Sequence, residues 1–223
     1  MVERAVEPEF RGARLRLVED LRAKGIRDMA VLRAFERVPR HQFVPSGIRH
    51  RAYDDSPLPI GNGQTISQPY IHAHYLELLG LKGREKVLEI GTGTGYQTAL
   101  LAQLVPQVFS IERIPALTVQ AQGNMEKLGI RNVTLRTADG TLGWAEHAPF
   151  DAILVSAGSP SVPQPLLDQL ADGGRLLVPE GDLDTQHLMV YTRRGARVDK
   201  REVAPVRFVP LIGSHGWENG KAD

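Results

Sequence analysis

The stretch from Val87 to Tyr96, Val-Leu-Glu-Ile-Gly-Thr-Gly-Thr-Gly-Tyr, joins an apolar, strand-like segment directly to a glycine-rich turn and to the start of a helical pattern. In doubly wound α/β folds, a ligand resembling a nucleotide binds at this place, outside the carboxyl ends of the parallel strands. Glycine permits the sharp turn and lets the backbone approach the ligand, because no Cβ stands in the way. The stretch therefore predicts a doubly wound α/β fold with a ligand at the turn.

The spacing of the glycines distinguishes between ligands. A dinucleotide-binding loop needs the pattern G-x-G-x-x-G, and this chain has Tyr96 or Thr98 in place of the third glycine, depending on the register. The observed G-x-G-x-G after a carboxylate resembles instead the S-adenosylmethionine loop of the Rossmann-like methyltransferases. A glycine-rich turn without a ligand is the alternative. The candidate cofactor residues in this stretch are Glu89, Gly91, Thr92, Gly93, Thr94 and Gly95.

Two further acidic residues follow predicted strands. Glu112, with Arg113 after it, ends the second strand, about 20 residues beyond the first glycine, and a carboxylate there can accept hydrogen bonds from both ribose hydroxyls of an adenosine. Asp139 and Gly140 follow the third strand, where methyltransferases often place an acidic residue against the adenine amino group. Taken alone, Glu112 is a surface charge and Asp139-Gly140 an ordinary turn. Together with the glycine turn, all four residues become candidates for cofactor binding.

Outside this stretch, the chain divides into a helical part and an alternating part. Helical apolar patterns cover residues 10–24 and 29–38 and resume after Ser67, and a long irregular segment, residues 40–65, lies between them. Short β-rich runs then alternate with helices, which favours a mostly parallel sheet covered on both faces. The predicted strands are 87–90, 108–111, 133–135, 152–155 and 175–178, with a helix at 163–170 before the last of them.

The final strands lack a helix between them, so residues 187–193 and 200–211 predict an antiparallel pair at the edge of the sheet. The predicted fold class is thus a Rossmann-like α/β domain, doubly wound and mostly parallel, with antiparallel C-terminal strands and an N-terminal helical extension. We expect one domain over 1–223, made of N-terminal helices and a substrate loop (1–82), a cofactor-binding core with edge strands (83–213) and a tail (214–223).

Composition and charge exclude several classes of function. The chain has 27 Lys and Arg against 26 Asp and Glu, a formal net charge of +1, which gives no electrostatic case for a nucleic-acid or membrane partner. Cysteine is absent, so disulfides, thiol nucleophiles and cysteine-bound zinc are excluded, and we expect no metal site. No apolar run approaches the ~18 residues of a membrane span, and Met1 to Phe10 lacks the apolar core of a signal peptide. We expect a cytoplasmic monomer.

Several motifs together indicate a family. The run Asp55-Ser-Pro-Leu-Pro-Ile-Gly-Asn-Gly-Gln-Thr-Ile-Ser-Gln-Pro69 resembles the signature loop of the protein-L-isoaspartate O-methyltransferases, and the run from Val87 to Ala99 resembles their cofactor loop. Phe43-Val-Pro45, Asp151-Ala-Ile153 and Phe208-Val-Pro-Leu211 also match. The resemblance covers about residues 10–213. One departure is Ala138, where the family usually has glycine before Asp139-Gly140.

The resemblance implies a reaction and a set of residues. S-adenosyl-L-methionine would methylate the free α-carboxylate of an L-isoaspartyl residue in an age-damaged protein or peptide, leaving S-adenosyl-L-homocysteine, and the ester would close to a succinimide that reopens partly to aspartate. A carboxylate is already ionised at pH 7, so the site needs no general base and has to orient the nucleophile and exclude water.

Ser67 is the candidate catalytic residue, as a hydroxyl that orients the substrate carboxylate; the alternative is that it only caps the helix after it. The resemblance places Gln64, Thr65, Ile66 and His72 near the cofactor, although His72 could equally be a histidine of the helix core or surface. Extended segments suited to pairing with the backbone of the substrate contain the remaining candidates, Ile60, Gly61, Gly63, Val209, Pro210 and Leu211, with Thr65 and Ser67 beside them.

Two competing functions have different sequence requirements. Another methyltransferase of this fold, acting on a small molecule or RNA, would share the glycine loop, Glu112 and Asp139. It would not need the loop from Asp55 to Pro69, and an RNA enzyme should show a basic patch. A cofactor-binding domain without activity would be favoured by a damaged catalytic loop, whereas Ser67 and its neighbours are intact.

Overall fold

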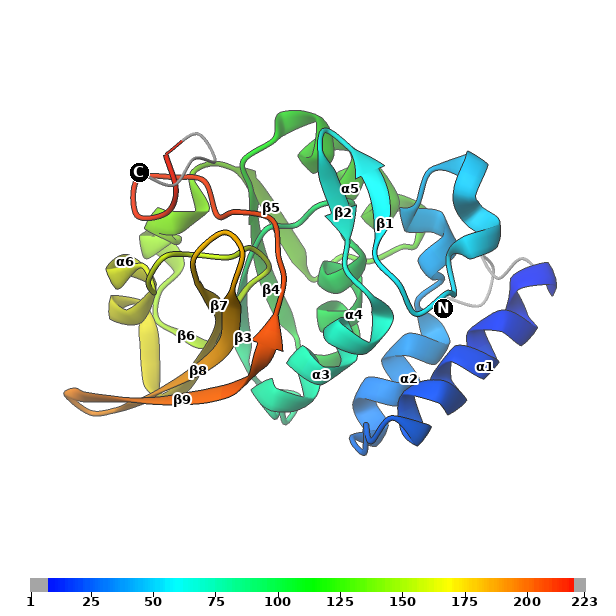
Figure 1. Cartoon of the computed structure of the whole chain (residues 1–223). Coiled ribbons are helices and arrows are strands. Elements are labelled where there is room, and N and C mark those ends of the chain that lie inside the picture. The colour runs from blue at the N-terminus through cyan, green and yellow to red at the C-terminus, as the bar shows by residue number, and fades with distance from the viewer. Residues whose placement is uncertain (1–7, 219–223) are drawn as a thin grey trace.

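The apolar runs predicted as strands form a seven-stranded sheet in the computed structural model, which describes residues 8–218 (Figure 1). The strands are β3 (Lys86–Ile90), β4 (Gln107–Glu112), β5 (Val133–Thr137), β6 (Phe150–Val155), β7 (Leu170–Gly181), β8 (Gln186–Arg194) and β9 (Arg197–Val206). Their order is β5-β4-β3-β6-β7-β8-β9. The pairs from β5 to β7 are parallel, and β8 and β9 are antiparallel to their neighbours. The predicted fold class is confirmed.

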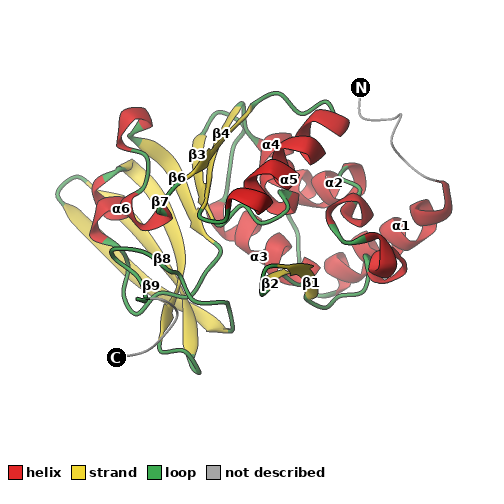
Figure 2. Cartoon of the chain, turned by 90° about the horizontal axis from the view of Figure 1, so that it is seen from above, coloured by secondary structure: helices red, strands yellow, loops and turns green. Residues whose placement is uncertain are grey.

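Successive side chains along β3 and β6 point to opposite faces of the sheet and are nearly all buried, so both faces of the sheet are covered. The helices are α1 (Pro8–Ala23), α2 (Met29–Arg37), α3 (Pro69–Leu79), α4 (Tyr96–Leu104), α5 (Pro115–Lys127) and α6 (Gln164–Asp168). Val87 and Leu154 belong to a core shared with α1 to α5, whereas Leu88 and Ile153 belong to a second core with Leu166 of α6. Figure 2 shows α1 to α5 on one side of the sheet and α6 on the other.

The segment expected to be irregular, residues 40–65, contains regular structure. Two 3₁₀ turns, Arg40–Phe43 and Ser46–Arg51, precede a short hairpin of β1 (Leu58–Gly61) and β2 (Gln64–Ile66). Asn62 and Gly63 connect the two strands with φ of 53° and 69°. Positive φ at both central residues is the signature of a type I′ hairpin turn, for which Asn-Gly is the preferred sequence. The hairpin holds the signature loop in one conformation.

Several predicted boundaries differ from the structure. The helix expected at 163–170 covers Gln164–Asp168, because the chain already enters β7 at Leu170. The last strand ends at Val206 instead of residue 211, since Phe208 bonds through its N–H and C=O to the side chain of Gln186. The expected tail does not begin at 214, because Ser214 and Trp217 bond to the core. Residues 1–7 and 219–223, which belong to the predicted domain and tail, lie outside the described residues.

Across residues 8–218, no helix is both long and apolar enough to cross a membrane. In the same residues, no group of three or more His, Cys, Asp or Glu side chains is arranged to hold a metal ion.

Candidate functional site

A pocket lies at the carboxyl ends of β3, β4 and β6, where the doubly wound fold is expected to bind its ligand. The glycine turn forms its floor, and the β1–β2 hairpin and the segment after β9 close it from the other sides. Sixteen of the predicted site residues line it: Ile60, Gln64, Thr65, Ile66, Ser67, His72, Gly91, Thr92, Gly93, Thr94, Glu112, Arg113, Gly140, Val209, Pro210 and Leu211.

The glycine turn needs its glycines for two reasons. Gly91 and Gly93 have φ of 95° and 56°, in the region that glycine favours, and a Cβ on Gly91 would lie 3.3 Å from Cβ of Ser156. The N–H of Gly93 donates to Oε2 of Glu112 at 2.9 Å, and the N–H of Ile114 donates to Oε1 at 2.9 Å. A carboxylate has about four lone-pair sites, so Glu112 fixes the turn and still has acceptor capacity for a ligand.

Glu89 does not line the pocket. Its side chain is fully buried behind the turn, where its Oε2 accepts hydrogen bonds from the hydroxyls of Thr98 (2.5 Å) and Ser110 (2.7 Å). The Ser110 hydroxyl also contacts that of Thr92 at 2.6 Å, which connects Glu89 to the turn. Burial raises the pKa of Glu89 to about 7, although both hydrogen bonds act to lower it. Glu89 therefore supports the turn from behind.

Gly95 and Asp139 were also predicted to bind the cofactor, and neither lines the pocket. A Cβ on Gly95 would lie 2.8 Å from Cε of Met125, so this glycine allows α5 to pack closely. The Asp139 carboxylate turns instead to the N–H groups of Thr141 (2.9 Å) and Ser214 (2.7 Å). Of the predicted substrate residues, Gly61 at the end of β1 and Gly63 in the hairpin turn do not line the pocket either.

His72 contributes a neutral ring to the pocket wall. It is 7% exposed, bonds through Nδ1 to Oε1 of Gln97, and packs edge-on against Tyr96 with 5.3 Å between ring centroids. Burial and the nearby positive charge of Arg40 lower the pKa of His72 to about 3. The ring therefore carries no charge at neutral pH and does not repel a cation in the pocket.

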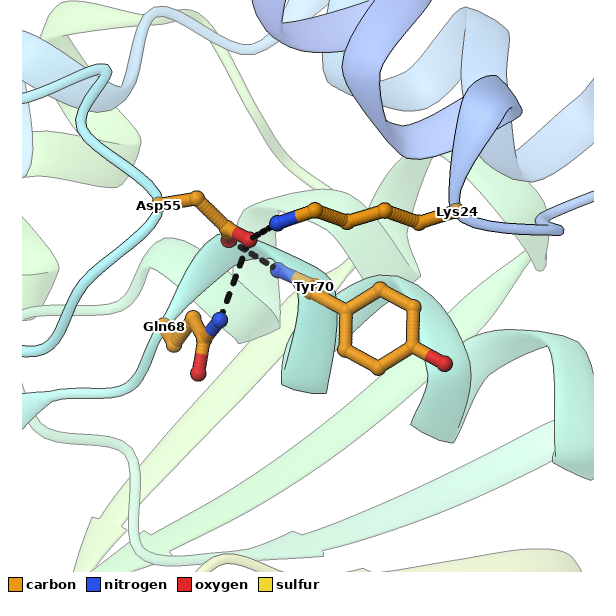
Figure 3. Close-up of polar contacts among 4 residues, drawn as sticks. All are labelled: Lys24, Asp55, Gln68 and Tyr70. Atoms are coloured by element: carbon orange, nitrogen blue, oxygen red, sulfur yellow. Dashed lines mark hydrogen bonds and ion pairs between the residues drawn. The ribbon is translucent and has the colours of Figure 1, made fainter.

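The start of α3 is capped by Asp55. Capping of this helix was the alternative role for Ser67. Its carboxylate accepts the N–H of Tyr70 at 2.9 Å and the side-chain amide of Gln68 at 3.0 Å, and it pairs with Lys24, the residue that follows α1 (Figure 3). A negative charge at the start of α3 is favourable. Partial burial would raise the pKa of Asp55, but the bonds from these three residues outweigh it and lower the pKa. Ser67 caps no helix, because α3 begins after Gln68.

A second hollow adjoins the pocket on the side away from the glycine turn. It is lined by Pro57, Gln68, Ile71 and the segment from Pro205 to Val209. Thr65, Ser67, Ser156 and Val209 line both hollows and so form their common border. Three hydroxyl groups thus stand where a group could pass from a ligand in the first hollow to an acceptor in the second, which is the arrangement that a transferase requires.

Sequence reasoning missed some of the lining residues. Ser156 and Ala157 follow β6 directly, so the rule that ligands bind at strand ends could have found them. Gln97 is a polar residue on the first turn of α4, directly after the glycine turn, so its place in the sequence could have identified it. Ile90, Ile111 and Leu117 line the pocket as apolar core residues, for which the sequence carries no separate signal.

The sequence comparisons agree on one family. Residues 13–216 match the family model described as protein-L-isoaspartate(D-aspartate) O-methyltransferase. A protein of Syntrophobacter fumaroxidans named protein-L-isoaspartate O-methyltransferase 1 is 54% identical over 210 residues, which cover 94% of this chain and 98% of the relative. A protein of Dictyoglomus thermophilum named protein-L-isoaspartate O-methyltransferase is 48% identical over 95% of this chain and 96% of its own length.

The comparisons with solved structures indicate the same family. A solved structure named protein-L-isoaspartate O-methyltransferase is similar with a TM-score of 0.83 at 31% identity, over 91% of this chain and 67% of the other. A crystal structure from Plasmodium falciparum, described as a protein-L-isoaspartate O-methyltransferase in complex with S-adenosyl-L-homocysteine, gives a TM-score of 0.79 at 28% identity, over 88% of this chain and 97% of the other.

Proposed function

The chain belongs to the protein-L-isoaspartate(D-aspartate) O-methyltransferase family, and on this premise we propose how its two adjoining hollows serve the reaction. It is an S-adenosylmethionine-dependent enzyme that methylates the free α-carboxylate of L-isoaspartyl residues in damaged proteins and peptides, which starts their repair. The observation that carries the assignment of the site is the common border of the hollows, at which Ser67 stands.

The first hollow is the cofactor site in this proposal. When bound there, S-adenosylmethionine supplies the electrophilic methyl group on its sulfonium. Gly91 and Gly93 provide the close backbone approach, and Glu112 offers acceptor capacity to the ribose hydroxyls. Gly140 also suits a bound cofactor, because it packs closely against the pocket wall: a Cβ on Gly140 would lie 2.4 Å from Cγ2 of Ile90, another lining residue. The neutral ring of His72 suits a site for a positively charged cofactor.

The second hollow is the acceptor site. The substrate carboxylate is ionised at neutral pH, so the hydroxyl of Ser67 donates a hydrogen bond that orients it without removing its charge. Ser156 and Thr65 face the same border and add two further donors. Val209 and its neighbours supply an extended wall for the substrate backbone. A site built in this way accepts many flanking sequences, as a repair enzyme must.

The family acts on isoaspartyl proteins. We also propose that the enzyme works as a cytoplasmic monomer without a nucleic-acid or membrane partner. They are supported by the balanced charge of +1 and by the two hollows, which the described residues of one chain line by themselves. The alternative of a small-molecule or RNA methyltransferase loses its support, since relatives over more than 90% of the chain are isoaspartyl enzymes.

Methyl transfer to two peptides that differ in one residue, isoaspartate or aspartate, tests the function. Label from S-adenosylmethionine should appear as a base-labile ester on the isoaspartyl peptide alone. Ser67→Ala should lower kcat by at least about tenfold, as expected for the loss of a hydrogen bond to a charged group, while Ser46→Ala, on an exposed turn, should have no effect. Cofactor binding without transfer to either peptide would refute the proposed reaction.

A further inference from the structure

The segment after β9, residues 208–217, is here called the C-terminal strap, and it forms one wall of the cofactor pocket through Val209 to Ile212. Its first half is fixed to the core by backbone bonds. The N–H of Gly158 donates to the carbonyl of Val209 at 2.8 Å, and the N–H of Leu211 donates to the carbonyl of Gly158 at 2.7 Å. The strap therefore enters the pocket wall at a defined position.

The second half of the strap is held by Asp139 and by Trp217, whose indole N–H donates to the carbonyl of Gly158 at 3.1 Å. The N–H of Ser214 donates to the Asp139 carboxylate at 2.7 Å, and the N–H of His215 donates to Oγ1 of Thr141 at 3.1 Å. Thr141 in turn donates through its hydroxyl to Asp139 at 2.6 Å. Gly213 passes so close that a Cβ on it would lie 2.1 Å from Oδ1 of Asp139 and 2.8 Å from Cγ2 of Thr141.

Asp139 is charged in this arrangement. Partial burial would raise its pKa, but the bonds from Ser214 and Thr141 outweigh this and lower it. Hydrogen bonds to a charged acceptor are stronger than those between neutral groups. The bonds to Thr141 orient the carboxylate, and the bond to Ser214 fastens the strap to the loop that also supplies Gly140 to the pocket.

We propose that Asp139 is a positioning residue that acts through Ser214: it fastens the C-terminal strap against the cofactor pocket, and release of this fastening lets the cofactor and its product exchange. The inference rests on the proposed function of the pocket. It assigns Asp139 a role different from the predicted contact with the adenine amino group, because its side chain is not among the groups that line the pocket.

Two substitutions separate these roles. Gly213→Ala forces the strap away from Asp139 while the carboxylate and the lining residues keep their identity. Asp139→Asn presents a weaker acceptor to Ser214. Both should accelerate the release of S-adenosylhomocysteine by at least about tenfold, the effect expected for a lost hydrogen bond to a charged group. Gly47→Ala is the matched control, because a Cβ at Gly47 would meet nothing within 4 Å.

The experiment measures release of labelled S-adenosylhomocysteine from the full chain after addition of excess unlabelled ligand. It is repeated with S-inosylhomocysteine, in which oxygen replaces the adenine amino group. Urea unfolding of the ligand-free variants checks that they fold. Under the proposal, both substitutions speed the release of both ligands by the same factor, and the preference for the adenosyl ligand stays at its wild-type value.

Three results would overturn the proposal. Wild-type release from Gly213→Ala would show that the strap does not retain the ligand. If Asp139→Asn lost the preference for the adenosyl ligand while Gly213→Ala released it at the wild-type rate, Asp139 would be shown to contact the adenine ring instead. If the wild type bound neither ligand, the proposed cofactor pocket would fail together with this inference, whereas binding with unaltered release rejects the inference alone.

Discussion

Replacing Asp55 by alanine tests how the loop that carries Ser67 is held. The Asp55 side chain is 16% exposed and accepts bonds from Tyr70 and Gln68, and it pairs with Lys24, which is 46% exposed. We expect Asp55→Ala to lower both the free energy of unfolding and kcat, because Gln68 alone separates Ser67 from the helix that Asp55 caps.

The magnitude follows from the contacts. Loss of a capping side chain costs about 1 kcal/mol, and loss of the second hydrogen bond to a charged acceptor costs about 1.5 kcal/mol more. The ion pair is largely exposed on the lysine side and adds less than about 1 kcal/mol. Asp55→Ala should therefore lower the free energy of unfolding by about 2–3 kcal/mol, and Lys24→Met by less than about 1 kcal/mol.

The pH dependence has a defined sign. Because the pKa of Asp55 is lowered in the native state, its contribution is complete above the ordinary pKa of 3.8 and is lost as the pH falls through the native value. The difference between the wild type and Asp55→Ala should thus be constant near neutral pH and shrink in acid.

Urea unfolding and steady-state kinetics at saturating cofactor measure the two effects. The matched control is Asp54→Ala, whose ion pair with Arg51 is half exposed on both sides and should contribute less than about 0.5 kcal/mol. If Asp55→Ala unfolded like Asp54→Ala and kept the wild-type kcat, the reasoning that Asp55 positions Ser67 would be refuted.

Three further predictions concern other charged groups. The pKa of Glu89 is raised from 4.5 to about 7, so only the native state keeps this proton between these values, and the free energy of unfolding should fall by about 3 kcal/mol across that window. Urea titrations should show a smaller fall in Glu89→Gln, and an equal fall would contradict this assignment. Glu112→Gln should weaken S-adenosylhomocysteine binding by about tenfold in calorimetry, and an unchanged Kd would argue against a ribose contact. Among the described residues that line the second hollow, Arg207 alone is charged, so the enzyme should have a lower KM, by at most about fivefold, for peptides with glutamate than for peptides with lysine beside the isoaspartate. Arg207→Gln should remove this preference and Arg201→Gln should not. A preference that survives Arg207→Gln would exclude Arg207 as its source.

The sequence predicted the fold because its local signals agree with one another. The strand-like runs and the glycine turn both appear where expected, and α2 starts after a favourable cap, Asp28, which accepts the N–H groups of Ala30 and Val31. The hairpin at 58–66 was not predicted, although Asn62-Gly63 is a strong turn signal, because the surrounding prolines and glycines suggested an irregular loop. The early end of the last strand depends on Gln186, a contact between residues far apart in the chain.

Only part of the site could be predicted, also because some positions depend on contacts between distant residues. The type of a residue does not show with which neighbour its side chain forms a hydrogen bond or packs. Gly95 has the spacing of a ligand-binding glycine but serves the packing of Met125, and Asp139 has the position of an adenine contact but bonds to Ser214. Glu89 precedes the turn and faces Ser110 behind it. These choices are decided by tertiary neighbours, which the linear pattern does not contain.

The outermost strand of the sheet, β9, has a consequence for an enzyme that handles damaged proteins. Such substrates expose unpaired backbone, and an open sheet edge can recruit it and nucleate aggregation. Five of the ten residues of β9 are charged, and Pro205 near its end removes one backbone donor. Charges and proline on an edge strand oppose the addition of another strand. These features of β9 therefore disfavour coaggregation, along this edge, between the enzyme and the partly unfolded proteins that it repairs.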